Sequence, residues 1–328
     1  MSALRCTHCG YLEAIASSAE QVVEHPFEDY KDGPKGWGAE LKRYDCKQCG
    51  ARTSIEPHIT SFECAFCSSN QVVPQSDTIA LHKPESILPF AVNQKQCLEE
   101  FRRWVNGLWF RPNALKKQAT PDKLRGVYMP FWTYDSLTDS YWSAQAGHYY
   151  YVKDSQGNRR RKVRWEPASG RYNQYFDDLL VPGSPSVGHD LIQDLQPFST
   201  QALIDYKSEY LAGFAAEDYR QDMLECWPVA KSSMETTIYN ECARQIPGDT
   251  YRQLSISTSY LNRTYKLCLL PIWIASYRYG GEPYRYVVNG QTGAVAGRAP
   301  WSWVKITLFV LTLAALIGAF VWWRGNAG

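Results

Sequence analysis

The C-terminal part of the chain contains one uncharged apolar run, residues 306–323, in "WSWVKITLFVLTLAALIGAFVWWRGNAG". Its eighteen residues would form a helix of about 27 Å, at about 1.5 Å per residue, which is enough to cross the hydrocarbon core of a bilayer. Trp301 and Trp303 precede the run, Trp322 and Trp323 close it, and Lys305 and Arg324 can snorkel from its two ends. A buried core helix would need a large domain around it, whereas only four residues follow Arg324. We therefore predict a single transmembrane helix at 303–323 that anchors the chain by its C-terminus.

Two CxxC pairs, separated by fourteen residues, lie in "YDCKQCGARTSIEPHITSFECAFCSS". Zinc prefers four tetrahedral thiolates, and each CxxC turn directs two sulfurs at one point. The spacing is typical of a zinc ribbon, and Gly50 after the first pair permits the tight turn of a knuckle. We predict a ribbon at residues 40–75 with zinc as a structural cofactor, because four protein ligands leave no open position for catalysis. The predicted ligands are Cys46, Cys49, Cys64 and Cys67.

A further CxxC pair, Cys6 and Cys9, has no second pair left to complete its site. Residues 1–30 therefore have the pattern of a partial zinc-ribbon half. Three alternatives are open: the first half of this ribbon lies upstream of Met1, His8 or His25 completes a metal site, or the two thiols bind no metal.

The cysteine pattern also indicates a compartment. CxxC thiolates persist in reducing conditions, and the N-terminal "MSALRCTHCG" lacks the apolar segment of an export signal. We expect the bulk of the chain in the cytoplasm and its anchor in the cell inner membrane. The formal net charge is only +2, so whole-molecule electrostatics do not indicate a nucleic-acid coat.

Residues 85–298 have the pattern of an α+β domain, with helices packed on an antiparallel sheet. One helix is predicted to begin after Asn93, which can form a capping box with Gln96. A second is predicted from Ser199 or Thr200, and a third must be kinked or broken at Pro228. The predicted strands are GVYMPFWTYDS, DSYWSAQAGHYYYVKD, RKVRWEP, YKLCLLPIWIASYRY and PYRYVV, with turns at SQGN, Gly280-Gly281 and Asn289-Gly290.

Two short segments of this domain resemble each other. "MPFWTY", around Pro130 and Trp132, matches "LPIWIA", around Pro271 and Trp273. Each follows an amphipathic helix and precedes a hairpin. Either the domain is internally duplicated, or two independent strands share a short pattern.

The sequence contains none of the motifs that identify common catalytic sites: no P-loop, GxSxG, HExxH or EF-hand loop. Asp177 and Asp178 are adjacent, and neighbouring residues on a strand point to opposite faces, so one catalytic centre is not expected to use both. We predict that the protein is not an enzyme.

The segment "NRRRKVRWEP" places five basic residues beside Trp165 on a predicted hairpin, after three consecutive tyrosines at 149–151. The candidate binding residues are Arg159, Arg160, Arg161, Lys162 and Arg164. Three interpretations are open: a charged edge strand that resists aggregation, a surface for anionic lipid headgroups or an acidic protein, or a nucleic-acid site.

Several motifs in order carry a family resemblance: the ribbon, "VYMPFWTYD", "RWEPASGRYNQYFDDLLV", "YLAGFAAEDY", "LLPIWIASYRYGGEPYRYVVNGQTG" and the C-terminal helix. Nearly the whole chain resembles a family of bacterial TFIIB-type zinc-ribbon membrane proteins, often automatically named primosomal protein N′ or superfamily II helicase. No helicase motor motif is present here. The resemblance implies two ribbons with eight cysteines in all, so Cys6 and Cys9 match only the second knuckle of the first. It also implies partners of the phage-shock or band-7 (SPFH) type in envelope stress.

Together these features predict a non-enzymatic, tail-anchored membrane adaptor that binds the lipid bilayer and a protein partner. Trp37 and Phe66 are expected to be exposed aromatic anchors for that partner. The alternative is a nucleic-acid-binding protein of replication or transcription that uses the ribbon and the basic hairpin. No small-molecule substrate is indicated.

Overall fold

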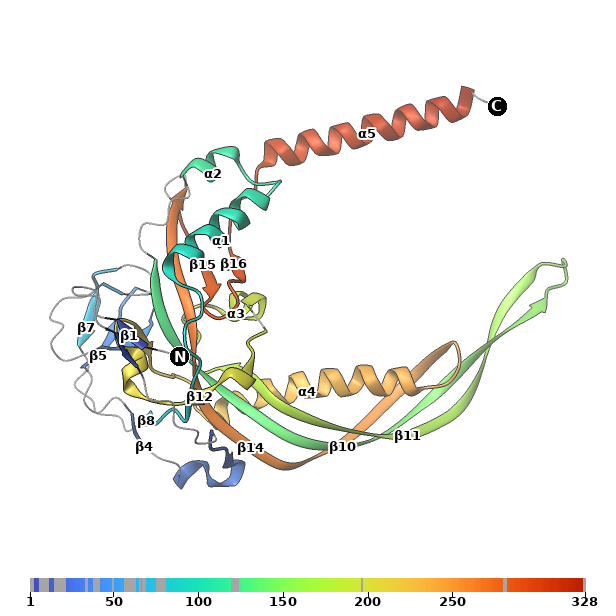
Figure 1. Cartoon of the computed structure of the whole chain (residues 1–328). Helices are drawn as coiled ribbons and strands as arrows, with labels where there is room; N and C mark the ends of the chain where they lie inside the picture. The colour runs from blue at the N-terminus through green and yellow to red at the C-terminus, as the bar shows by residue number, and fades with distance from the viewer. Residues whose placement is uncertain are drawn as a thin grey trace.

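The computed structural model describes residues 3–5, 12–14, 22–32, 35–37, 42–48, 50–55, 63, 64, 66, 69–74, 81–118, 124–195, 197–279 and 282–326. Figure 1 shows a body from which two extensions project: a long curved arm of three strands, and helix α5 (Trp303–Asn326). The arm consists of β10 (Arg125–Lys153), β11 (Arg159–Pro182) and β14 (Thr250–Tyr279).

The other elements form the N-terminal region and the body. The earlier strands are β1 (Ala3–Arg5), β2 (Leu12–Ala14), β3 (His25–Pro26), β4 (Lys35–Trp37), β5 (Lys42–Cys46), β6 (Arg52–Ile55), β7 (Val72–Pro74), β8 (Leu81–His82) and β9 (Ser86–Ile87). The later strands are β12 (Ile204–Asp205), β13 (Ala215–Glu217), β15 (Glu282–Asn289) and β16 (Val295–Gly297). The helices are α1 (Gln94–Gly107), α2 (Asn113–Gln118), α3 (His189–Leu195) and α4 (Met223–Gln245), with 3-10 turns η1 (Phe27–Asp32), η2 (Thr200–Ala202) and η3 (Ser208–Leu211). The predicted α+β class is confirmed.

The arm is built on three very long strands, with β10 in the middle. β10 has 29 residues and pairs antiparallel with β11 on one side and with β14 on the other. The segments 126–136 and 139–154, predicted as separate strands, are therefore one continuous strand up to Lys153. The predicted turn at 155–158 and the hairpin between β14 and β15 are confirmed.

Bulges bend the arm. Among the described residues, three that are not glycine have positive φ: Asp178 (50°), Asn262 (49°) and Gln253 (54°). All three lie where the strand register shifts. A bulge adds one residue to one strand and increases the local twist. The arm curves accordingly in Figure 1.

Helix α4 lies along the concave side of the arm (Figure 1). Asp222 and Glu225 form a capping box at its start. The helix continues through Pro228, so the predicted break at this residue is wrong. Tertiary packing of the buried face of α4 outweighs the cost of the interior proline. Its buried face consists of Met223, Cys226, Ala230, Met234, Ile238 and Cys242.

The helix predicted from Ser199 or Thr200 is wrong. The side chain of Ser199 makes no capping hydrogen bond, and the segment contains η2, β12 and η3 instead. Ile204 of β12 pairs with Ile87 of β9, so strand pairing takes precedence over local helix propensity here.

Helix α1 begins with the predicted capping box between Asn93 and Gln96. Phe101 from this helix stacks on Tyr286 of β15, with ring centroids 3.9 Å apart. α1 therefore covers the β14–β15 end of the sheet, as α4 covers the arm.

The two similar segments pair with each other at the centre of the sheet. Met129 of β10 lies opposite Leu270 of β14, Tyr128 lies opposite Pro271, and Pro130 lies opposite Leu269. Pro130 corresponds to Pro271 in the repeat, and Tyr128 corresponds to Leu269, so the pair Tyr128–Pro271 has its equivalent in the pair Leu269–Pro130. The two segments are therefore related by a local two-fold axis through the Met129–Leu270 pair.

The same backbone contacts occur on both sides of this axis. Gly183 N–H donates to the Pro130 carbonyl, and Gly290 N–H donates to the Pro271 carbonyl, both at 2.9 Å. The Gly183 carbonyl accepts hydrogen bonds from the N–H groups of Arg220 and Gln221, which directly precede the α4 cap, Asp222. The Gly290 carbonyl accepts hydrogen bonds from the N–H groups of Ala91 and Val92, which directly precede the α1 cap.

The two tryptophans complete the correspondence. Trp132 Nε1 donates to the carbonyl of Gln221 at 3.0 Å, and Trp273 Nε1 donates to the carbonyl of Val92 at 2.8 Å. Each acceptor directly precedes a helix cap. Both halves therefore share one local structure, which favours internal duplication, one of the two open alternatives, over two independent strands.

The strands around the cysteine knuckle extend the main sheet. β5 pairs with β6 and β7, and Ser54 of β6 pairs with Ala216 of β13, which lies beside β10. The β5–β7 sheet is thus joined to the body by backbone hydrogen bonds rather than by a linker alone.

Candidate metal centre and exposed surfaces

Cys46 ends β5 inside a tight turn. Its N–H donates to the carbonyl of Ala51 at 2.9 Å, and its carbonyl accepts from the N–H of Gly50 at 2.8 Å. Gly50 has φ of +72°, a conformation that glycine adopts without a steric cost. The backbone therefore wraps around Cys46 as a zinc knuckle requires.

Cys64 lies in a second turn, in which its N–H donates to the carbonyl of Ser69 at 2.9 Å. Cys46 and Cys64 are both buried, and they belong to one cluster with Ala51 and Phe66. One cysteine from each predicted knuckle thus belongs to the same buried cluster. Cys49, Cys67, Cys6 and Cys9 lie outside the described residues.

The β5–β7 sheet is also attached to the body by a buried ion pair. Asp218, which follows β13, accepts a hydrogen bond from Ser54 Oγ at 2.6 Å and lies 3.0 Å from Arg43 Nε. Arg43 also donates to the carbonyl of Trp37 at 2.8 Å. Both charged side chains are buried, so the attachment depends on their pairing.

Trp37 and Phe66 are not exposed anchors, and that prediction is wrong. Trp37 is 4% exposed and donates from Nε1 to the hydroxyl of Tyr206 at 3.3 Å, whereas Phe66 is 1% exposed beside the knuckles. Both aromatic side chains contribute to cores. Neither side chain is therefore accessible to a partner.

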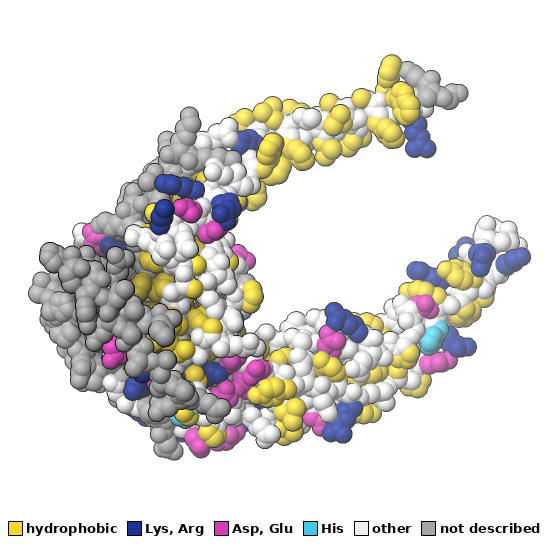
Figure 2. Space-filling model, in the orientation of Figure 1, with side chains coloured by type: hydrophobic (Ala, Val, Ile, Leu, Met, Phe, Trp, Pro, Cys, Tyr) yellow, Lys and Arg dark blue, Asp and Glu magenta, His cyan; other side chains and the backbone are white. Residues whose placement is uncertain are grey.

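The five basic candidate residues lie at the tip of the arm, where Lys and Arg side chains gather in Figure 2. Arg159 lies over the ring of Tyr151 at 5.0 Å, and Arg161 lies over Tyr149 at 4.4 Å. Of the other three, Arg160 pairs with Asp154, Arg164 pairs with Glu166, and Lys162 lies opposite Tyr150 in the β10–β11 ladder. Residues 148–166 contain six basic and two acidic side chains, a local charge of +4 against +2 for the whole chain.

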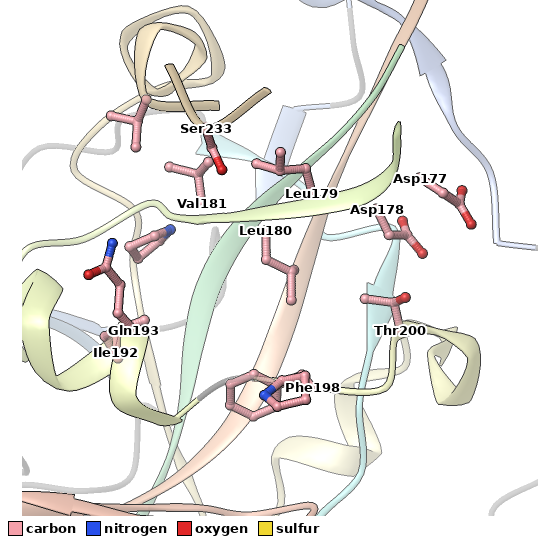
Figure 3. Close-up of a pocket in the computed structure, with 13 residues that line it drawn as sticks. Asp177, Asp178, Leu179, Leu180, Val181, Ile192, Gln193, Phe198, Thr200 and Ser233 are labelled. Atoms are coloured by element: carbon pink, nitrogen blue, oxygen red, sulfur yellow. The ribbon is translucent and has the colours of Figure 1, made fainter. Parts of the chain in front are cut away.

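The adjacent pair Asp177 and Asp178 lines a cavity of about 380 Å³ beside β11. Figure 3 shows both carboxyl groups at the same end of this cavity. Strict alternation along β11 would point the two side chains to opposite faces of the sheet. Asp178, however, lies at a bulge with φ of 50°, where the side chains do not alternate.

Asp178 belongs to a cluster of charges that sequence analysis missed. Lys266 Nζ lies 2.5 Å from Asp178 and 2.8 Å from Glu24, and Asp135 Oδ1 accepts from the N–H of Asp178 at 2.6 Å. Thr264 Oγ1 lies 3.0 Å from Asp135 Oδ2. These residues are up to 242 positions apart, so only strand pairing brings them together. The available signals were Asp135, the one charged residue of the predicted strand 126–136, and Lys266 next to an apolar run.

Burial and the neighbouring Glu24 raise the pKa of Asp135 to about 7. Burial opposes the charge on Lys266, but its ion pairs with Asp178 and Glu24 outweigh that effect and raise its pKa. The three carboxyl groups lie close enough to hold a metal ion, but the Lys266 ammonium already lies between two of them. The arrangement fits an internal ion cluster at the bend of the arm.

This cluster makes stability depend on pH. Because the pKa of Asp135 is raised in the folded state, the folded state binds this proton more tightly than the unfolded state does. The resulting stabilisation of the fold is complete below about pH 4 and is lost as pH rises through about 7, at about 1.4 kcal/mol for each unit by which the two pKa values differ. Asp135→Asn keeps the shape of the neutral acid, and we expect it to flatten the fall in unfolding temperature between pH 5 and 8. Burial also raises the pKa of Glu85 to about 7, so the unfolding temperature of this variant should still fall with pH, but less steeply.

The control for this measurement is Asp139→Asn, at an exposed carboxylate paired with Arg171. Its unfolding temperature should follow the same pH profile as the natural protein. An unchanged slope in Asp135→Asn would contradict the assignment of the titrating group.

No protein-family model and no solved structure matches this chain. The chain is similar to the uncharacterized protein YdjG of Bacillus subtilis (strain 168), with 27% identity over 234 residues. The alignment covers 70% of this chain and 68% of YdjG. The comparisons therefore identify a distant relative and assign no activity.

Proposed function

We propose that the protein is a single-pass membrane adaptor, anchored by α5, with its body at the cytoplasmic face of the cell inner membrane. The observation that carries the proposal is the apolar helix Trp303–Arg324, which has a mean hydropathy of 2.3 and is not buried by the rest of the chain. Among the described residues it is the one helix with the length and composition to cross a bilayer. Water-exposed apolar surface of this extent is strongly unfavourable, and lipid removes it from water.

Zinc has a structural role in this proposal. Cys46 and Cys64, with Cys49 and Cys67, would hold one ion in a closed set of four thiolates. The ion would stabilise the β5–β7 sheet, and through the β6–β13 pairing it would support the body. The ribbon therefore acts as a folding element rather than as the surface that meets a partner.

The arm offers a surface for a protein partner. Leu137 of β10 pairs with Tyr175 of β11 and with Leu261 of β14, and all three side chains are exposed. They form a row across the face of the arm opposite α4. Exposed apolar groups of this kind are typical of interaction sites. The family resemblance favours a cytosolic scaffold of the phage-shock or SPFH type as the partner.

The test is affinity capture of partners from detergent-solubilised membranes by the full-length protein. We expect Leu137→Asp together with Leu261→Asp to reduce partner recovery roughly thirtyfold, if the two side chains contribute about 2 kcal/mol. The protein itself should remain in the membrane fraction.

The matched control is Tyr239→Asp, at an exposed position of α4 on the other side of the arm. Its partner recovery should equal that of the natural protein. Equal recovery by the double leucine variant would exclude the row as the partner surface, and natural protein in the soluble fraction would overturn the anchor.

The charged tip of the arm favours a second candidate function, nucleic-acid binding, and it equally suits anionic headgroups. For a chain truncated after residue 300, we expect Arg159→Glu, Arg161→Glu and Lys162→Glu together to weaken binding to phosphatidylglycerol vesicles. At about 1 kcal/mol per basic residue, the loss is roughly a hundredfold. Arg102→Glu with Arg103→Glu, exposed on α1, is the control and should have little effect.

Salt dependence separates the two ligands. Retention of the truncated chain on DNA with a steep dependence on salt concentration would favour the nucleic-acid function. Absence of retention on DNA or heparin at low salt would remove it.

A further inference from the structure

The turn between α1 and α2, residues 108–113, holds the start of α5. The Ser302 N–H donates to the carbonyl of Phe110 at 2.9 Å, and the guanidinium of Arg111 lies 3.5 Å from the ring centre of Trp301. The ring of Phe110 packs edge-on against Phe309, with centroids 5.3 Å apart. α5 is thus docked on the body at its first turns.

A lysine on the helix strengthens this attachment. Lys305 Nζ donates to the carbonyl of Trp109 at 3.1 Å and to Asn113 Oδ1 at 2.7 Å. One charged group of α5 therefore satisfies two acceptors of the 108–113 turn, and the turn and the helix start form one unit.

The contact with Phe309 sets how deep the 108–113 turn would lie in the bilayer that α5 crosses. Phe309 lies six residues after Trp303, or about 9 Å further along the helix at about 1.5 Å per residue. It also belongs to the uncharged run that α5 would place in hydrocarbon. A side chain that packs on Phe309 must therefore reach the boundary between headgroups and acyl chains.

The exposed side chains around this unit suit that boundary. Trp109 and Trp303 are each 75% exposed, and Trp301 is also exposed. Tryptophan is favoured at the membrane interface because its ring is apolar and its N–H can still meet water or headgroups. Arg111 and Lys305 lie beside these rings, where cationic side chains can extend toward phosphate groups.

We propose that residues 108–113 form a second membrane contact, which inserts Trp109 and Phe110 into the interfacial region of the bilayer that α5 crosses. The occupant is lipid, because Phe110 packs on Phe309 of the apolar helix and the ring of Trp109, the preceding residue, is exposed beside it in the chain. This inference rests on the proposed membrane anchor. It makes α5 a fixed support that orients the body, rather than a flexible tether.

The test uses the full-length protein in vesicles of phosphatidylethanolamine and phosphatidylglycerol, with a photo-reactive benzoylphenylalanine at one position per variant. The positions are Trp109, Phe309 in the helix, and Tyr141, an exposed residue of the arm. On illumination we expect lipid adducts, detected by mass, at positions 109 and 309, at several times the yield at position 141.

The outcomes separate the inference from the anchor. Adducts at 309 without adducts at 109 overturn the interfacial turn and leave the anchor intact. Absence of adducts at 309 overturns the anchor and the inference with it. Equal yields at 109 and 141 also overturn the inference, because ordinary surface exposure would then explain the labelling.

Discussion

The double variant Cys46→Ser, Cys49→Ser is expected to lose its bound zinc and to unfold the β5–β7 sheet. Two thiolates cannot complete a tetrahedral site, and structural zinc contributes an apparent free energy of about 10–16 kcal/mol in isolated zinc-finger peptides. Because Ser54 of β6 pairs with Ala216 of β13, the loss should extend into the body. Elemental analysis of the purified protein and its thermal unfolding measure the two effects.

Cys242→Ser is the matched control for this variant. Cys242 is buried in α4 and belongs to no CxxC pair, so the substitution should lower stability modestly and leave the zinc content unchanged. Natural protein purified without one equivalent of zinc, or a double variant that retains its zinc, would refute the predicted metal site.

Asp218→Ala is expected to destabilise the protein by about 3–5 kcal/mol, the usual cost of breaking a buried ion pair. The substitution leaves the buried guanidinium of Arg43 without its carboxylate and removes the acceptor of Ser54 Oγ. The β5–β7 sheet should therefore separate from the body before the arm unfolds. Chemical denaturation measures the free energy, and hydrogen exchange locates the region that opens first.

A compensating substitution makes this prediction specific. Adding Arg43→Met to Asp218→Ala removes the buried charge that has lost its ion pair with Asp218 and should recover part of the lost stability. Asp139→Ala, at an exposed ion pair, should leave the unfolding temperature unchanged. If the double variant were less stable than Asp218→Ala alone, the ion pair would not be the origin of the effect.

The contacts of the β5–β7 sheet change the expected role of the ribbon. Isolated ribbons often present their surfaces to partners, but here β6 is paired with β13, and Trp37 and Phe66 are buried. In the proposed function, zinc would therefore support the folding of the body. The arm, with its exposed row and charged tip, provides the accessible surface.

The sequence by itself determined the features that depend on neighbouring residues. The Asn93–Gln96 capping box, the hairpins that follow β10 and β14, and the apolar run of α5 were all predicted, because caps, turns and hydrophobic runs involve residues close in the chain. The matching Pro-Trp segments were also visible, although their pairing was not.

Tertiary structure decided what depends on pairing between distant segments. The bulge at Asp178 brings its carboxylate to Lys266 and its N–H to the carboxylate of Asp135, against the alternation expected of a strand. The segment after Ser199 forms a strand rather than a helix because β9 is there to pair with it. Burial of Trp37 and docking of the 108–113 turn on α5 likewise depend on partners more than 160 residues away, which no local pattern encodes.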